Sequence, residues 1–114
     1  MLHTRPLSLN KDFRRVYARA RSRVHPLLVT YAIRNGLPFC RLGITASKKV
    51  GNAVQRNRAR RIVREAYRLY EPAVSPGWDF VFVIRKAMIQ QNSKTQDAAK
   101  VLERHIKELC TKKK

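Results

Sequence analysis

The segment from Lys48 to Arg64 restricts the fold of this chain more than any other part of the sequence. It reads KKVGNAVQRNRARRIVR and carries seven Lys or Arg residues and no acidic residue. Downstream of Gly51 its apolar residues recur at the spacing of one helix face. A helix with one apolar face and one dense cationic face repels itself unless an anion or dissolved salt screens the charge. The segment therefore predicts a helix that binds a polyphosphate.

This helix is expected to run from Asn52 to about Tyr70. Its apolar face consists of Ala59, Ile62, Val63, Ala66, Leu69 and Tyr70. Its cationic face consists of Arg56, Arg60, Arg64 and Arg68 at steps of four, with Asn57 and Arg61 beside them and Arg58 at the boundary. A solvated helix face usually mixes signs, whereas only Glu65 interrupts this one, and arginine favours bidentate contacts to phosphate. Asn57 has two interpretations, as a group that binds a base or ribose hydroxyl or as a plain exposed residue.

The residues just before the helix suit an anion. Gly51 is expected to adopt a backbone conformation that larger residues avoid, and Asn52 is expected to cap the helix. Lys48 and Lys49 add positive charge beside the helix N-terminus. The GxxxxGK[ST] signature is absent, so nucleotide hydrolysis is not expected.

The composition indicates one basic, folded domain over residues 1–114, ending in a short disordered basic tail at 111–114. Hydrophobic residues make up 44% of the chain, which is enough for a modest core. The chain has 26 Lys and Arg against 7 Asp and Glu, a net charge of +19. Such an excess opposes folding through self-repulsion and is typical of domains that bind nucleic acid.

A membrane is the rival partner for so much positive charge, and the sequence does not favour it. The N-terminal residues lack the apolar core of a signal peptide, and the run from Phe80 to Ile84 is far too short to span a bilayer. Cys40 and Cys110 stand alone and the three histidines are scattered. The sequence thus predicts reduced thiols, no metal site, no small-molecule substrate and a cytoplasmic location.

The order of elements predicts an α+β fold, a compact α/β sandwich with a mixed sheet of about four strands and three main helices. Helices are expected over 8–20, 52–70 and 93–110, and strands over 27–34, 41–46 and 78–84, the last one central. A further strand near 47–50 would give the order αβββαβα. Asn35-Gly36 is a turn signal, which predicts that the first two strands form an antiparallel hairpin. A right-handed crossover is the default for the helix over 52–70.

Three aromatic residues, Phe13, Tyr17 and Tyr31, have two interpretations. Phe13 and Tyr17 are one helical turn apart among several arginines, and rings in such a setting stack on unpaired bases. Equally, aromatic residues at helical spacing often anchor a helix to its sheet.

The sequence holds no self-sufficient active site. Its seven acids are scattered and form no carboxylate cluster of the kind that binds two metal ions. Ser47 has no evident His and Asp partners. We therefore expect no catalytic residue in this chain.

The motif from Lys48 to Arg64 resembles the "RNR" signature of the bacterial ribonuclease P protein subunit. The resemblance extends over nearly the whole chain, through LSLNKDF at 7–13, LGITAS at 42–47 and DFVFVIRK at 79–86. It implies a left-handed βαβ crossover around the motif helix. It also implies a protein that binds a large catalytic RNA, which removes the 5′ leader of precursor tRNA with divalent metal ions such as Mg²⁺.

The resemblance assigns two sets of site residues. The surface for the catalytic RNA would consist of Lys48, Lys49, Asn52, Arg56, Asn57, Arg58, Arg60, Arg61 and Arg64. The cleft for the precursor-tRNA leader, between the first helix and the sheet, would be lined by Phe13 and Tyr17. A strand residue is expected there as well, and a one-residue shift of register decides between Thr30 and Tyr31.

Three other functions remain open at this point. A ribosomal or other structural RNA-binding protein would bind RNA without assisting cleavage. A DNA-compacting protein would bind duplex DNA and structured RNA with similar affinity. A charge that served only solubility would give no salt-sensitive affinity for RNA.

Overall fold

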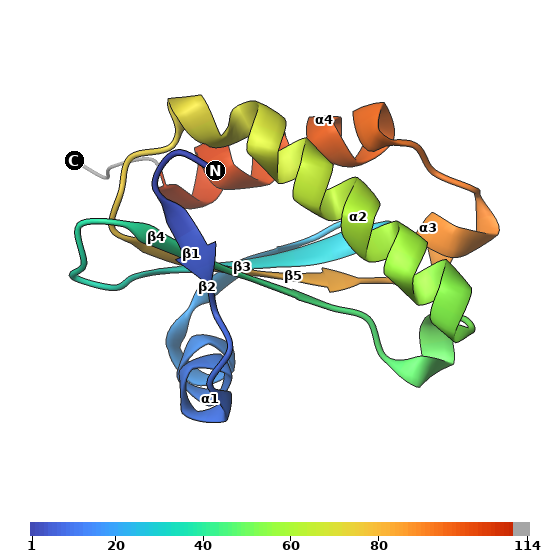
Figure 1. Cartoon of the computed structure of the whole chain (residues 1–114), viewed down its shortest axis with the longest axis horizontal. Helices are drawn as coiled ribbons and strands as arrows, with labels where there is room; N and C mark the ends of the chain where they lie inside the picture. The colour runs from blue at the N-terminus through green and yellow to red at the C-terminus, as the bar shows by residue number, and fades with distance from the viewer. Residues whose placement is uncertain (111–114) are drawn as a thin grey trace.

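A mixed five-stranded sheet forms the centre of the molecule, and the computed structural model describes residues 1–110 of it. The strands lie in the order β1-β4-β5-β3-β2, with bounds Thr4–Pro6, Cys40–Thr45, Trp78–Ile84, Leu28–Arg34 and Arg21–Val24. The predicted tail at 111–114 lies outside the described residues. Two helices, α2 (Ala53–Tyr70) and α4 (Thr95–Cys110), cover one face, and α1 (Asn10–Arg19) lies against the other (Figure 1).

The central position predicted for the strand at 78–84 is confirmed. β5 pairs with β4 in parallel and with β3 in antiparallel orientation, and five of its seven residues are buried. An apolar strand of this kind needs a partner along both edges. The predicted hairpin between the strands at 27–34 and 41–46 is therefore wrong, because β5 lies between them. The turn itself exists, with Gly36 at a φ of 71°.

Three short elements escaped the sequence patterns. β1 and β2 hold three and four residues and carry Arg and Pro among them, so neither shows an apolar alternation. The short helix α3 (Lys86–Gln90) follows β5 directly. The strand expected near 47–50 is wrong as well, because Lys48–Val50 forms a turn of 3₁₀ helix, η1. The sheet thus has five strands where about four were expected, in the mixed α+β fold that was predicted.

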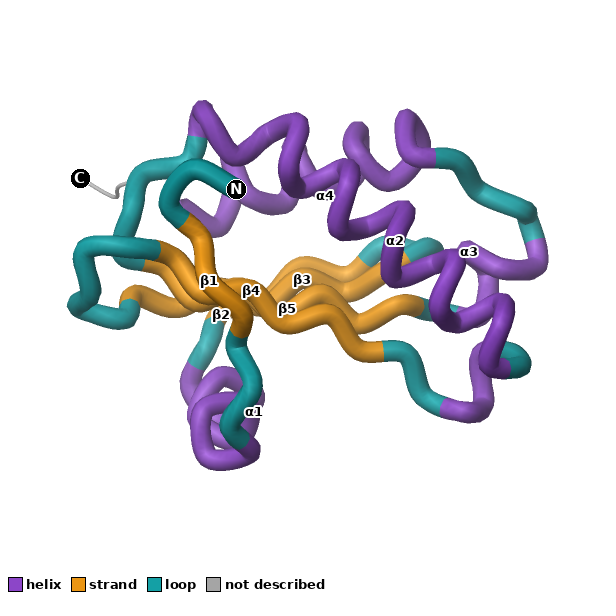
Figure 2. Tube along the Cα trace, viewed as in Figure 1, coloured by secondary structure: helices purple, strands orange, loops and turns teal. Residues whose placement is uncertain are grey.

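The crossover from β4 through α2 to β5 is left-handed. In Figure 1 both strands run from left to right, β5 lies behind β4, and α2 crosses above them. The right-handed default is wrong here. A right-handed path would place α2 on the face that α1 occupies. It would also separate α2 from α4, and the two helices pack against each other in the structure. Figure 2 shows the two long helices together on one side of the strands.

Each face of the sheet has its own apolar core. The larger core lies under α2 and α4 and includes Phe80, Phe82 and Leu102, all fully buried. The smaller core joins Leu7 and Val16 to Val81 under α1. Leu69, which was expected on the apolar face of α2, is 58% exposed, and Tyr67 is buried in its place. The reason is that α2 packs against both the sheet and α4, which moves its buried face by part of a turn.

A polar pair lies inside the larger core. Thr30 and His105 are both buried, and Thr30 Oγ1 and His105 Nδ1 share a hydrogen bond of 2.7 Å. The pKa of His105 is lowered first by burial and then by the charges of His25, Arg104 and Arg23, while Glu108 acts in the opposite direction. The imidazole of His105 therefore stays neutral in the folded protein at pH values at which it is protonated in the unfolded chain.

We expect this histidine to make stability depend on pH. Below about pH 6.5 the unfolded chain takes up a proton that the folded chain refuses, so the free energy of unfolding falls as pH falls. A His105→Asn variant should lose part of that slope in urea unfolding measured between pH 7 and pH 5. A slope equal to that of the wild type would show that His105 does not contribute to it.

Candidate nucleic-acid interface

The N-terminus of α2 is closed by a reciprocal pair of hydrogen bonds. Asn52 Oδ1 accepts from Gln55 N at 2.8 Å, and Gln55 Oε1 accepts from Asn52 N at 2.9 Å. Asn52 therefore caps the helix, as predicted, and this bond uses its side-chain oxygen. The prediction for Gly51 is wrong, because its φ of 162° is extended backbone that any residue adopts. A Cβ at Gly51 would lie 2.6 Å from Gln55 Oε1, so close packing keeps this position small.

Two arginines on the β4 side of α2 are held in place by protein oxygen atoms. Arg56 Nη1 donates to the carbonyl of Gly51 at 2.8 Å. Arg60 donates to Asn57 Oδ1 at 2.9 Å and to the carbonyl of Ala46 at 3.3 Å. These contacts restrict the two guanidinium groups and orient Asn57, while leaving part of each group toward the surface.

The other cationic residues of the motif have no protein partner among residues 1–110. Arg58, Arg61 and Arg64 are exposed along α2 and form no hydrogen bond or ion pair there. Lys48 and Lys49 are exposed in η1, just before the helix. These five like charges lie close together and none of them is paired with an acid, because the nearby Glu65 pairs with Arg68. Such a group of charges suits an extended anion.

Every acidic side chain of the protein forms an ion pair or accepts a hydrogen bond within the protein. Five of them pair with arginine or lysine: Asp12 and Asp79 with Arg41, Glu65 with Arg68, Glu103 with Lys107 and Glu108 with Arg23. Asp97 accepts from the backbone N–H of Lys94, and Glu71 from those of Leu2 and His3. Burial alone would raise the pKa of Glu71, but hydrogen bonds from Thr4, Leu2 and His3 hold it below its usual value. Each carboxylate of the chain therefore has at least one cationic or backbone N–H partner.

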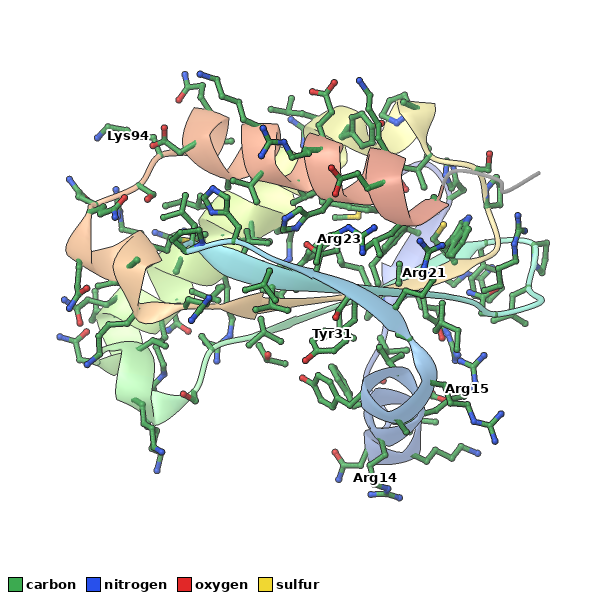
Figure 3. The ribbon with its side chains drawn as sticks, turned by 180° about the vertical axis from the view of Figure 1, so that it is seen from behind. Arg14, Arg15, Arg21, Arg23, Tyr31 and Lys94 are labelled. Atoms are coloured by element: carbon green, nitrogen blue, oxygen red, sulfur yellow. The ribbon has the colours of Figure 1, made fainter. Side chains whose placement is uncertain are left out.

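The face of the sheet that α1 covers only in part carries the aromatic residues. Tyr17 and Tyr31 meet edge to face, with ring centroids 5.1 Å apart, and Phe13 lies 6.4 Å from Tyr17. Tyr17 is 44% exposed, and Phe13 and Tyr31 are half-buried. Figure 3 shows Tyr31 on the α1 side of the sheet. The three rings form one accessible apolar surface, so they serve neither as pure core nor as isolated surface residues.

The alternation of β3 separates the two candidate strand residues. Tyr31 pairs with Val81 of the smaller core, whereas Thr30 pairs with Phe82 of the larger one. Thr30 is fully buried beneath α4 and bonded to His105. The assignment of Thr30 to the cleft is therefore wrong in this structure, and Tyr31 is the strand residue on that face.

A buried carboxylate that the sequence patterns did not single out fixes α1 on the sheet. Asp79 is fully buried and accepts hydrogen bonds from Arg41 at 2.9 and 2.8 Å, from Arg15 of α1 at 3.2 Å and from Asn35 at 2.8 Å. Arg41 also reaches Asp12 of α1 at 3.2 Å, and the hydrogen bonds that Arg41 donates to Asp79 raise the pKa of Arg41. A lone acid in the most apolar strand was the available signal, because a buried charge requires partners.

Within the described residues the structure contains no group of three or more His, Cys, Asp or Glu side chains that could hold a metal ion. Cys40 and Cys110 are free thiols. None of the helices in residues 1–110 is long and apolar enough to cross a bilayer.

Comparison with known proteins supports one family. The sequence profile of the family Ribonuclease P matches residues 1–112. The "Ribonuclease P protein component" of Alkaliphilus oremlandii is 41% identical over 93 residues, which cover 82% of each chain. That of Clostridioides difficile is 45% identical over 83 residues, covering 72% of this chain and 73% of its own.

Solved structures agree with the sequence comparison. The RNase P protein of Staphylococcus aureus superposes with a TM-score of 0.79 at 30% identity, over 90% of this chain and 93% of that one. The RNase P protein of Thermotoga maritima gives a TM-score of 0.77 at 28% identity, over 87% and 92% of the two chains. The similarity extends over most of the fold and not the basic motif alone.

Proposed function

Because this chain belongs to the ribonuclease P protein family and, as a subunit of that enzyme, serves in the processing of tRNA 5′ ends, we propose that it acts entirely by binding RNA. The RNA subunit supplies the catalytic groups, and the protein supplies two surfaces. One surface binds the catalytic RNA and the other binds the 5′ leader of precursor tRNA. The location that this role requires is the cytoplasm, where precursor tRNA is available.

The observation that carries this proposal is a difference in partners between the acidic and the basic side chains. All seven acids have a partner within the protein, whereas Lys48 and Lys49 of η1 and Arg58, Arg61 and Arg64 of α2 have none among residues 1–110. A protein built for acid–base chemistry would keep at least one carboxylate or imidazole accessible in a cleft. In this one the exposed carboxylates of Glu65, Glu103 and Glu108 are each paired with a cation. The charge without a protein partner in η1 and α2 is positive, which suits a phosphate backbone.

The surface for the catalytic RNA is centred on α2 and η1. Arg58, Arg61 and Arg64 contact phosphates directly, and Lys48 and Lys49 extend the contact toward the sheet. Arg56 and Arg60, held by backbone carbonyls, present their remaining N–H groups in fixed directions, which favours bidentate binding. Asn52 contributes through the cap that starts the helix.

The surface for the leader is the aromatic one on the opposite face of the sheet. A single-stranded leader can stack its unpaired bases on Tyr17, Tyr31 and Phe13, since stacking tolerates any base. The separation of the two surfaces by the sheet lets one protein hold the catalytic RNA and the substrate together.

Divalent metal ions such as Mg²⁺ belong, in this proposal, to the RNA-protein holoenzyme. The carboxylates of this chain do not fit such an ion, because each one already accepts from a cation or a backbone N–H. The protein contributes by offsetting phosphate repulsion with its own cations, which lowers the concentration of Mg²⁺ that the RNA requires.

Reconstitution tests the proposal. The protein, its own ribonuclease P RNA and a precursor tRNA are combined, and cleavage is measured across a magnesium titration. The proposal expects cleavage at a lower magnesium concentration with the protein than without it. If the protein binds the RNA but neither tightens substrate binding nor lowers the magnesium requirement, it is a structural RNA-binding protein and the proposal fails.

Replacing Tyr17 with alanine is expected to weaken precursor tRNA binding roughly tenfold, the loss of one base-stacking contact. Binding of mature tRNA should change little, because it has no leader. Tyr17 is exposed enough that its removal leaves the smaller core intact. The measurement is the affinity of the reconstituted holoenzyme for both RNAs. An equal loss for precursor and mature tRNA would indicate that the ring serves folding and not leader binding.

A further inference from the structure

We infer that a pocket between α2 and the outer edge of the sheet receives one unpaired nucleobase of the ribonuclease P RNA. The inference rests on the proposed function, because it takes the RNA that contacts α2 as the source of the base. The pocket has a volume of about 280 Å³ and is lined by Thr4, Arg5, Pro6, Leu42, Ile44 and Arg64, together with Met1. It lies on the opposite side of the sheet from the aromatic surface that binds the leader.

The pocket exists because β1 is shorter than its neighbour. β1 pairs with β4 only as far as Pro6 opposite Leu42, and the bond from Leu7 N to the carbonyl of Leu42 is the last one between them. The chain then leaves this edge and enters α1 on the other face. β4 continues to Thr45 without a partner on its outer side, and α2 passes above it (Figure 1).

Ile44 provides both an apolar wall and a polar edge. Its side chain lies on the α2 face and is only partly buried. Its backbone has the same orientation as that of Leu42, two residues earlier, so its N–H and C=O point toward the open edge. Within residues 1–110 neither group has a backbone partner on that side. A neighbouring donor and acceptor match the Watson–Crick edge of an unpaired base.

The guanidinium group of Arg64 stands at the rim and no carboxylate lines the pocket. Arg64 comes from the cationic face of α2 and has no protein partner within the described residues. Arg5 lines the pocket as part of β1, but its guanidinium lies over the Phe39 ring, with its Cζ 4.0 Å from the centroid. Arg5 pairs with Arg41, whose side chain reaches Asp12 of α1, so the side chain of Arg5 lies on the α1 face. The Arg64 guanidinium suits a phosphate next to an extruded nucleotide.

The walls favour a base over a bare phosphate or a larger ligand. Leu42, Ile44 and Pro6 present apolar surface, which a phosphate would not use but a flat base would cover. The volume is below the usual range of small-ligand pockets, about 300–1,000 Å³. A single base fits such a space better than a nucleotide cofactor does.

Filling the pocket while keeping its charges tests the inference. In an Ile44→Phe variant the added ring occupies the space, and Arg5 and Arg64 remain. Affinity for the ribonuclease P RNA of the same organism should fall about tenfold, while the salt dependence of binding stays that of the wild type. The matched control is Leu69→Phe, which adds the same ring at an exposed position of α2 outside the pocket. The control should bind like the wild type.

Chemical probing of the RNA gives a readout that does not depend on the variant's affinity. Dimethyl sulfate and carbodiimide together modify the Watson–Crick edges of unpaired bases of all four types. The wild-type protein should protect one unpaired base that becomes reactive again with Ile44→Phe bound, while the rest of the footprint is unchanged. If Ile44→Phe does not fold by circular dichroism, Pro6→Met fills the pocket from its exposed wall.

Wild-type affinity and an unchanged footprint in a folded filling variant would overturn the inference. A loss of affinity together with a lower salt slope would also overturn it, because it would indicate phosphate contacts alone. Both results leave the proposed function intact, provided that the wild-type protein still lowers the magnesium requirement. If the wild-type protein fails in that assay, the proposed function itself is wrong.

Discussion

An Asp79→Ala variant is expected to lose about 3 kcal/mol of unfolding free energy. Asp79 is fully buried and accepts from three residues, two of which are arginines that remain behind after the substitution. Removing one partner of a buried ion pair usually costs 3–5 kcal/mol. Arg15 and Arg41 are 36% and 23% exposed, so water relieves part of that cost and the low end applies.

The measurement is urea unfolding at neutral pH, with Glu103→Ala as the matched control. Glu103 also pairs with a cation, Lys107, but lies on the exposed face of α4. Its removal should leave the unfolding midpoint nearly unchanged. If the two variants unfold at the same urea concentration, Asp79 does not anchor α1 to the sheet.

Replacing both Arg61 and Arg64 with alanine is expected to reduce the salt dependence of RNA binding by nearly two units of log–log slope. Each phosphate contact releases a counterion, and the structure leaves both guanidinium groups without a protein partner among residues 1–110. Between 50 and 200 mM salt the wild type should therefore lose about tenfold more affinity than the variant. Filter binding to the catalytic RNA at several salt concentrations measures this.

A double variant on α4, Lys100→Ala with Arg104→Ala, removes the same formal charge from another helix. Both residues are exposed, and neither belongs to the motif. This control should keep the slope of the wild type. Equal slopes for the two double variants would mean that net charge, and not the position of α2, governs binding.

The sequence predicted the elements whose patterns are long and strongly periodic. α2, α4 and β5 lie where their apolar spacing placed them, and the resemblance to one family indicated the left-handed crossover. The short strands β1 and β2 were missed, because three or four residues cannot display a period. The hairpin was wrong because a turn signal describes only local geometry, and the most apolar strand, later in the chain, took the place between the two strands.

The candidate site was predicted in the same uneven way. The motif residues from Lys48 to Arg64 were identified as a set, but their division into held and free arginines depends on the carbonyls of Gly51 and Ala46. Thr30 and Tyr31 could not be separated by pattern, since a shift of one residue exchanges the faces of a strand. The pairing of β3 with β5 separates them.

By itself, the sequence determined the charge of this protein, its cationic helix and its family, because these depend on residue types and their spacing along the chain. Tertiary structure decided which charges remain available. Folding brings Asp12, Glu71, Asp79 and Glu108 to partners distant in sequence, and it leaves Lys48 and Lys49 of η1 and Arg58, Arg61 and Arg64 of α2 without a partner among residues 1–110. It also created the pocket beside Ile44, which requires β1, β4 and α2 to meet. Contacts between residues distant in sequence follow from packing, and no local pattern records them.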